Sequence, residues 1–100
     1  MTTFDFSYAI ELLREGRCIA RTGWAGRGLF VFKQVPSSIG SEIIPKMQSV
    51  PQKAKQVILR TVGHIDYENQ CVIYDTKTGI ANSWVPSISD MFAADWYEVE

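Results

Sequence analysis

The sequence predicts one small α+β domain over residues 1–100, a small antiparallel β-sheet with an N-terminal helix and short additional helices. Three observations predict it: a helical apolar period near the N-terminus, six short β-prone segments, and a tight four-residue turn between two of them. A chain of 100 residues is too short for two independent cores. Apolar residues make up 46% and charged residues 21%, as in folded globular proteins.

The first predicted element is an amphipathic helix. Asp5 can cap its start and Gly16 can end it in the left-handed conformation, while the apolar residues between them recur at helical spacing: Phe6, Ala9, Ile10 and Leu13. Two strands follow, at 17–21 and 29–35, joined by a glycine-rich turn over 23–28 with Trp24 at its tip.

The middle of the chain alternates between turn-forming and regular segments. Residues 36–51 are rich in Pro, Ser and Gly and predict an ordered loop. Residues 52–62 favour a helix, although a short strand over 57–59 fits the same residues. Segments 64–67, 70–75 and 80–84 are β-prone, and the 76–79 turn joins the last two as a hairpin, which makes the sheet antiparallel.

The C-terminal stretch contains a short capped helix and a final strand. Ser87 and Asp90 match a capping box directly after Pro86, and three apolar residues form the expected inner face of that helix: Ile88, Met91 and Phe92. A strand over 96–100 then ends the chain, with Trp96 expected in the core.

Charge is uneven along the chain although its net value is −1. Up to Arg60 there are nine Lys or Arg against four acids, and from Thr61 onward one Lys against seven acids. Intrachain pairing is the favoured explanation. The alternative is that four early arginines gather near one site for an anionic ligand: Arg14, Arg17, Arg21 and Arg27. The net charge argues against a nucleic-acid polymer as partner.

The residues do not match a catalytic or metal-binding pattern. His64 is the one histidine, and Cys18 and Cys71 are 53 positions apart without a CxxC motif, so we expect neither a metal nor a cofactor. A Cys71–His64 dyad lacks an orienting group. The chain shows neither a membrane-length apolar run nor a signal-peptide pattern at its N-terminus, so we expect a cytoplasmic protein with free thiols.

The tryptophans are the best candidates for ligand contacts. Trp84 stands where a strand ends and a helix begins. A base stacked on an indole contributes roughly 1–3 kcal/mol, against about 0.3–1 kcal/mol for helix-start amides facing an anion. We therefore assign Trp84 to a ligand and Trp96 to the core. Trp24 fits either capping of the fold or a ligand face.

The motifs as a whole resemble a small phage and prophage family. The N-terminal pattern spans 6–28, with Ala25 and Arg27 at variable turn positions, and residues 44–51 resemble a loop of its longer members. The C-terminal pattern is the most diagnostic: Trp84-x-Pro86-Ser87-x-x-Asp90-Met91-x-Ala93-x-Asp95-Trp96. The family includes the second described type of Thoeris anti-defence protein.

This resemblance implies a non-enzymatic sponge that sequesters a cyclic ADP-ribose-type signal, a glycocyclic isomer, in the cytoplasm of the infected bacterial host. It also implies a homotetramer with pockets between subunits, and the many aromatic residues of this short chain agree with assembly. The implied ligand-binding residues are Trp24, Trp84, Pro86, Ser87 and Asp90, with Arg21 and Gly23 beside them.

Three alternatives remain open at this point. The pocket could prefer a cyclic di- or trinucleotide. The protein could be an enzyme that degrades the signal, although an acid–base pair is not evident in the sequence. It could also be an interaction module that binds single-stranded nucleic acid or a host protein through exposed aromatics.

Overall fold

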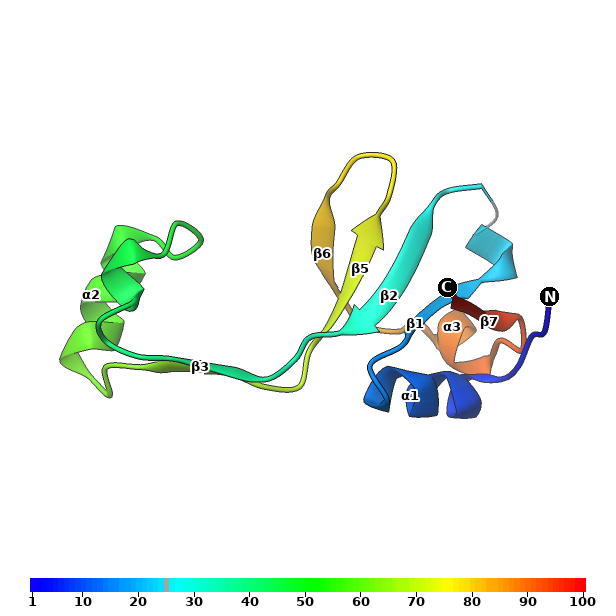
Figure 1. The fold of residues 1–100 in the computed structure, drawn as a ribbon, viewed down its shortest axis with the longest axis horizontal. Coiled ribbons are helices and arrows are strands. Elements are labelled where there is room, and N and C mark those ends of the chain that lie inside the picture. The colour runs from blue at the N-terminus through cyan, green and yellow to red at the C-terminus, as the bar shows by residue number, and fades with distance from the viewer. Residues whose placement is uncertain (25) are drawn as a thin grey trace. The chain divides into compact units, whose positions relative to one another are not determined.

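The structure, a computed structural model, describes residues 1–24 and 26–100, so Ala25 of the glycine-rich turn lies outside the described residues. Contacts group the chain into two compact units (Figure 1). Unit 1 comprises Met1–Val35 and Asn69–Glu100, and unit 2 comprises Pro36–Glu68. Each is described by itself, and the prediction of one domain over 1–100 stays a prediction.

Unit 1 is built on a five-stranded antiparallel sheet, which confirms the predicted α+β class. Its strand order is β6-β5-β2-β1-β7. The strands are β1 (Cys18–Arg21), β2 (Leu29–Lys33), β5 (Cys71–Asp75), β6 (Ala81–Trp84) and β7 (Trp96–Val99). The predicted 76–79 turn joins β5 to β6, and the glycine-rich turn, which opens with a short 3-10 segment (Thr22–Trp24), joins β1 to β2.

Helix α1 (Phe6–Arg14) forms as its sequence predicts. The Asp5 carboxylate accepts a hydrogen bond from the Tyr8 amide at 3.0 Å, and Gly16 follows the helix with a φ of +84°. That conformation strains any residue with a Cβ, which explains a glycine at this position. The helix packs against β1 and β7 (Figure 1).

The core of unit 1 lies between α1 and the sheet. Trp96, Ile19, Val31 and Ala9 are fully buried, joined by Leu12 and Leu13. The Trp96 indole donates a hydrogen bond from Nε1 to the backbone carbonyl of Asp90 at 2.9 Å, so its one polar group is satisfied. The assignment of Trp96 to the core is confirmed.

Helix α3 (Ile88–Phe92) starts with the predicted capping box, but its predicted inner face is wrong. The Ser87 and Asp90 side chains each accept the other's backbone amide. The expected inner residues Ile88, Met91 and Phe92 are exposed, Phe92 at 81%, and the buried residue is Asp90 at 8%. The reason is that Asp90 turns inward to pair with Arg21 at 2.9 Å, which points the apolar residues outward.

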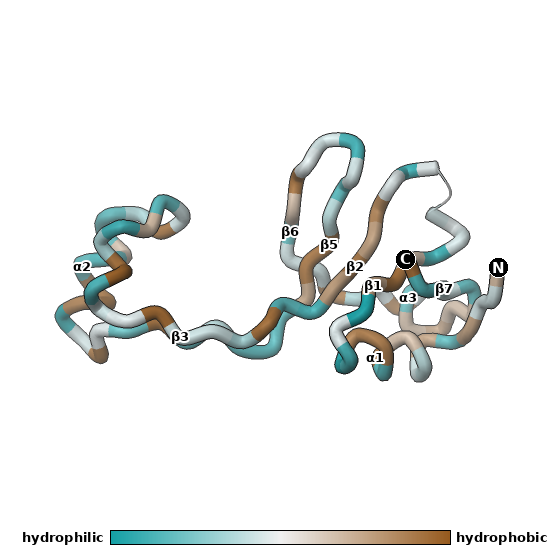
Figure 2. The backbone as a smooth tube through the Cα atoms, in the orientation of Figure 1, coloured by the Kyte–Doolittle hydropathy of each residue, from teal (hydrophilic) through white to brown (hydrophobic). Residues whose placement is uncertain are grey.

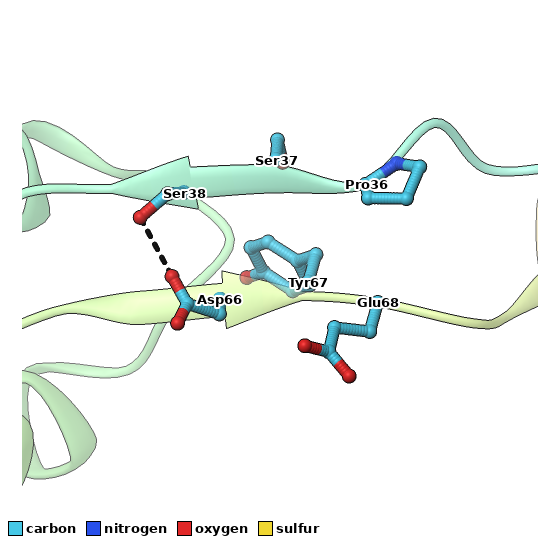
Figure 3. A pocket seen from close by; sticks show the side chains of 6 residues that line it. All are labelled: Pro36, Ser37, Ser38, Asp66, Tyr67 and Glu68. Carbon is cyan, nitrogen blue, oxygen red and sulfur yellow. Dashed lines mark hydrogen bonds between the residues drawn. The ribbon is translucent and has the colours of Figure 1, made fainter.

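Unit 2 combines a two-stranded ribbon with two short helices. Strands β3 (Ser37–Ile39) and β4 (Ile65–Tyr67) pair antiparallel, and the Ser38 hydroxyl donates to the Asp66 carboxylate at 2.6 Å (Figure 3). A 3-10 turn η2 (Ile44–Lys46) and helix α2 (Gln52–Arg60) follow β3. Helix α2 confirms the helix that the sequence favoured over a short strand at 57–59. Strand β3, in contrast, lies within residues 36–51, which we predicted as an ordered loop.

None of the helices in the described residues is long and apolar enough to cross a membrane.

Candidate ligand-binding site

Trp84 stands at the edge of the aromatic cluster that surrounds Trp96. Its ring centroid lies 6.0 Å from that of Trp96 and 6.3 Å from that of Phe6, both edge-on. Trp84 is only partly buried, whereas Trp96 is fully enclosed. Edge-on contacts hold the Trp84 indole in place while leaving part of its surface free for a further partner.

A cavity of about 270 Å³ opens beside Trp84 within unit 1. Helix α1 supplies one wall, the strands β2, β5 and β6 supply another, and the segment before α3 closes the end. The lining residues are Phe6, Ile10, Leu13, Arg14, Lys33, Cys71, Trp84 and Pro86.

Strand register brings three of these residues into one row. Lys33 pairs with Cys71 across β2 and β5, and Cys71 pairs with Trp84 across β5 and β6. Directly paired residues point to the same face of a sheet. The row therefore runs across the sheet beneath the apolar face of α1, which explains why residues 51 positions apart share one cavity.

The cavity has an apolar wall and a cationic rim. Arg14 and Lys33 both line it, and the Arg14 guanidinium pairs with Glu11 at 2.6 Å on the same helix. Burial raises the pKa of the Cys71 thiol, an effect that nearby Lys33 only partly offsets. Cys71 is therefore a protonated wall residue at neutral pH and a poor nucleophile.

A second group of predicted site residues forms a polar network at the start of the glycine-rich turn. Arg21 donates through Nη1 to Asp90 and through Nε to Asp95, both at 2.9 Å. The Asp95 carboxylate also accepts from the Gly23 amide at 2.9 Å and from the Thr22 hydroxyl at 3.1 Å. These groups satisfy one another within the chain.

Hydrogen bonding sets the charge state of both carboxylates. Burial alone would raise the pKa of Asp90, but the bonds from Ser87 and Arg21 outweigh it and hold that pKa below its usual value. Asp95 behaves alike: burial opposes ionisation, while bonds from Arg21, Gly23 and Thr22 lower its pKa. Both groups are thus anions that neutralise Arg21.

The structure divides the predicted site residues between these two places. Trp84 and Pro86 line the cavity. Arg21, Gly23, Ser87 and Asp90 belong to the polar network and the helix cap. Trp24 packs edge-on against Trp96 at 5.3 Å, so it caps the core.

Sequence reasoning did not place five of the lining residues in a ligand site: Phe6, Ile10, Leu13, Lys33 and Cys71. Arg14 entered it only as one of the four arginines of the alternative anion site. The one local signal was the helical spacing of Ile10 and Arg14, which puts that arginine beside the apolar face. The favoured intrachain pairing of the early arginines is confirmed for three of them: Arg14 with Glu11, Arg17 with Glu98, and Arg21 with Asp90 and Asp95.

Two other cavities carry carboxylates. One of about 290 Å³ lies in unit 2 along β3 and β4, where Asp66 and Glu68 line it (Figure 3). One of about 440 Å³ near the chain ends includes Glu98 and Glu100. Both suit an anion less well than the Trp84 cavity does. Among the described residues, no three His, Cys, Asp or Glu side chains gather to hold a metal ion.

The structure thus shows an α+β fold whose unit 1 contains an aromatic cavity with two cations in its lining. The family model of the Thoeris anti-defense 2-like domain (Tad2-like) matches residues 4–99, so the chain belongs to that family. The chain is also 25% identical over 100 residues to Thoeris anti-defense 2 of Bacillus phage SP01, with 95% of this chain and 93% of that protein covered. The resemblance seen in the motifs is confirmed.

Proposed function

We propose that this protein is a non-enzymatic phage sponge that sequesters a cyclic ADP-ribose-type immune signal, a glycocyclic isomer, and thereby blocks Thoeris defence. Its family is one of Thoeris anti-defence proteins. The observation that carries the proposal is the cavity with Trp84 in its wall and Arg14 and Lys33 on its rim. It would act in the cytoplasm of the infected bacterial host.

The chemistry of the cavity suits a nucleotide. A purine ring can stack on the free part of the Trp84 indole, with roughly 1–3 kcal/mol of binding free energy. Pro86 and the apolar residues of α1 exclude water around the ring, and the two cations favour the phosphates. Binding of this kind needs no cofactor.

The side chains near the cavity favour capture over hydrolysis. Cys71 is held protonated by burial, and Glu11 is engaged by Arg14. His64 belongs to unit 2 and lies 3.4 Å from the Asp66 carboxylate. The described cavity residues therefore do not include a nucleophile with a base beside it. This supports a sponge over an enzyme.

The other predicted site residues fit a positioning role in this proposal. Ser87 and Asp90 fix the start of α3 directly after Pro86, and Arg21 ties Asp90 to Asp95. Gly23 donates to Asp95, which holds the turn that carries Trp24 against Trp96. Through these bonds the network sets where the Trp84 to Pro86 segment lies.

We further propose a homotetramer. Val85, which lies between the cavity residues Trp84 and Pro86 in the chain, is exposed at 83%, and Ile88 and Phe92 on the following helix α3 are exposed at 73% and 81%. Adjacent exposed apolar side chains of this kind are typical of a protein interface. The cavity of about 270 Å³ is also at the small end of ligand sites, which typically measure about 300–1,000 Å³. A neighbouring subunit would complete the pocket.

The test compares the wild type with Trp84→Ala, using Tyr67→Ala in unit 2 as the matched aromatic control. We expect Trp84→Ala to weaken binding of the glycocyclic ADP-ribose signal at least tenfold, about 1.4 kcal/mol, with its circular dichroism unchanged. Tyr67→Ala should bind as the wild type does. Isothermal titration measures both.

The bound signal is then released by denaturation and analysed by chromatography. Recovery of intact signal supports the sponge, and appearance of a product would show an enzyme. Titration of cyclic di- and trinucleotides beside the ADP-ribose isomer tests the alternative ligand class. Wild-type affinity of Trp84→Ala would contradict the assignment of the cavity.

A further inference from the structure

The rim of the Trp84 cavity carries two cations that come from separate elements. Arg14 is the last residue of α1, and Lys33 is the last residue of β2. Both line the cavity together with Trp84 and Pro86. They are 19 positions apart in the sequence, so only the packing of α1 on the sheet brings them to one opening.

Arg14 and Lys33 are less fully neutralised than Arg17 and Arg21. Arg21 contacts two carboxylates, Asp90 and Asp95, and Arg17 contacts Glu98 at 2.9 Å and Glu15 at 3.7 Å. Arg14 shares one carboxylate, that of Glu11, through Nη1. A guanidinium has five N–H donors, so this pair leaves donors for a ligand.

Lys33 is placed to act on the same opening from the opposite wall. Its cross-strand partner Cys71 lies between it and Trp84 in the row across the sheet. Lys33 is partly buried. Its positive charge lowers the pKa of the Cys71 thiol, although burial raises that pKa by more. The described lining residues include no acid, and with Glu11 paired to Arg14 counted, the two cations still leave the rim with a net positive charge.

The surroundings strengthen this positive field. Phe6, Ile10 and Leu13 form an apolar wall below the rim, and charges act more strongly beside such a wall than in open water. An uncharged ring can enter the apolar part, whereas a charged phosphate would lose its hydration there at a large cost in free energy. A phosphate group would therefore remain at the rim, where the cations are.

We infer that Arg14 and Lys33 hold the diphosphate of the ligand at the cavity rim while its base lies against Trp84. This inference rests on the proposed function and narrows its ligands to nucleotides that carry both a base and a doubly charged diphosphate. Arg14 offers a planar fork that matches two phosphate oxygens, and Lys33 offers a single point charge. Neutral nucleosides would lose this part of the recognition.

The test uses the glycocyclic ADP-ribose isomer of the proposed function as the probe and measures affinity by isothermal titration at about 50 and 300 mM salt. We expect Arg14→Gln and Lys33→Gln each to weaken binding about tenfold, because hydrogen bonds to charged groups contribute about this much. The double variant should weaken it further and flatten the dependence on salt. Arg14→Lys keeps the charge without the fork and should fall between wild type and Arg14→Gln.

The controls are Lys53→Gln and Arg60→Gln on α2, which remove the same charge outside unit 1. They should bind like the wild type. If Arg14→Gln and Lys33→Gln also bind like the wild type while Trp84→Ala does not, the inference is wrong and the proposed function stands. If the wild type itself fails to bind the glycocyclic ADP-ribose isomer, the proposed function is wrong and the inference falls with it.

Discussion

Both units of this chain contain hydrophobic and hydrophilic residues (Figure 2), but they bury their apolar residues to very different extents. Unit 1 encloses a tryptophan, Trp96, together with Ile19 and Val31. Unit 2 encloses one apolar residue, Ile44, and one lysine, Lys55, which donates to the Pro45 carbonyl at 3.0 Å. Its remaining large apolar residues stay accessible, with Val62 exposed at 73%.

The difference teaches what a small chain needs to form a core. In unit 1 a five-stranded sheet presents one face to α1, so both surfaces lose water together. In unit 2 a two-stranded ribbon and a nine-residue helix have too little area to cover each other. The candidate cavity lies in the unit with the rigid core, where its walls keep their positions.

The largest expected effect comes from removing the centre of that core. Trp96→Ala should lower the free energy of unfolding by about 3–5 kcal/mol, because a fully buried indole and its hydrogen bond to Asp90 are lost. Urea unfolding followed by circular dichroism measures it. Val62→Ala in unit 2 is the comparison, with an expected loss of about 0.5 kcal/mol or less. Equal losses at both positions would contradict the contrast between the units.

A smaller effect is expected from acid, and it should be confined to unit 1. The pKa values of Asp90 and Asp95 are lowered in the folded state, so their contribution is present above the unfolded pKa of about 4 and is lost as pH falls below it. Stability should therefore drop between about pH 5 and pH 3.

Arg21→Gln should cost about 2 kcal/mol at pH 7 and reduce this acid-induced loss, since the partner that lowers both pKa values is gone. Urea midpoints at pH 7 and pH 3 provide the measurement. Asp66→Asn, which removes an exposed carboxylate from unit 2, is the control and should leave the pH dependence unchanged. An unaltered acid response in Arg21→Gln would show that the network does not set it.

The smallest effect on the core is expected from removing unit 2 altogether. The Gln34 amide donates to the Gln70 carbonyl at 2.9 Å, so the chain leaves and re-enters unit 1 at paired positions. Replacing 36–68 with Asn-Gly should form a two-residue turn there and change the stability of unit 1 by about 1 kcal/mol or less. Thermal unfolding measures it.

A peptide of residues 36–68 alone should lack stable structure, in line with the prediction of one domain. Cooperative folding of that peptide would contradict that prediction. Loss of folding in the shortened protein would instead show that unit 1 depends on unit 2.

The sequence by itself determined the local features of this protein. The Asp5 cap, Gly16, the 76–79 turn and the Ser87–Asp90 box all depend on hydrogen bonds between residues two to five positions apart, which local residue types encode. The family could also be identified from the sequence, because a motif is defined by residue types and their spacing. The burial of Trp96 could be predicted because this large aromatic residue starts a predicted strand.

Only the tertiary structure decided where the cavity lies and what it contains. Lys33, Cys71 and Trp84 meet through the register of three strands, and Arg14 reaches them because α1 packs on that face. The outward face of α3 has the same origin, since Arg21 lies 69 positions from Asp90 and yet turns it inward. Such contacts depend on how segments far apart in the sequence pair, and the residues next to a position in the sequence do not specify that pairing.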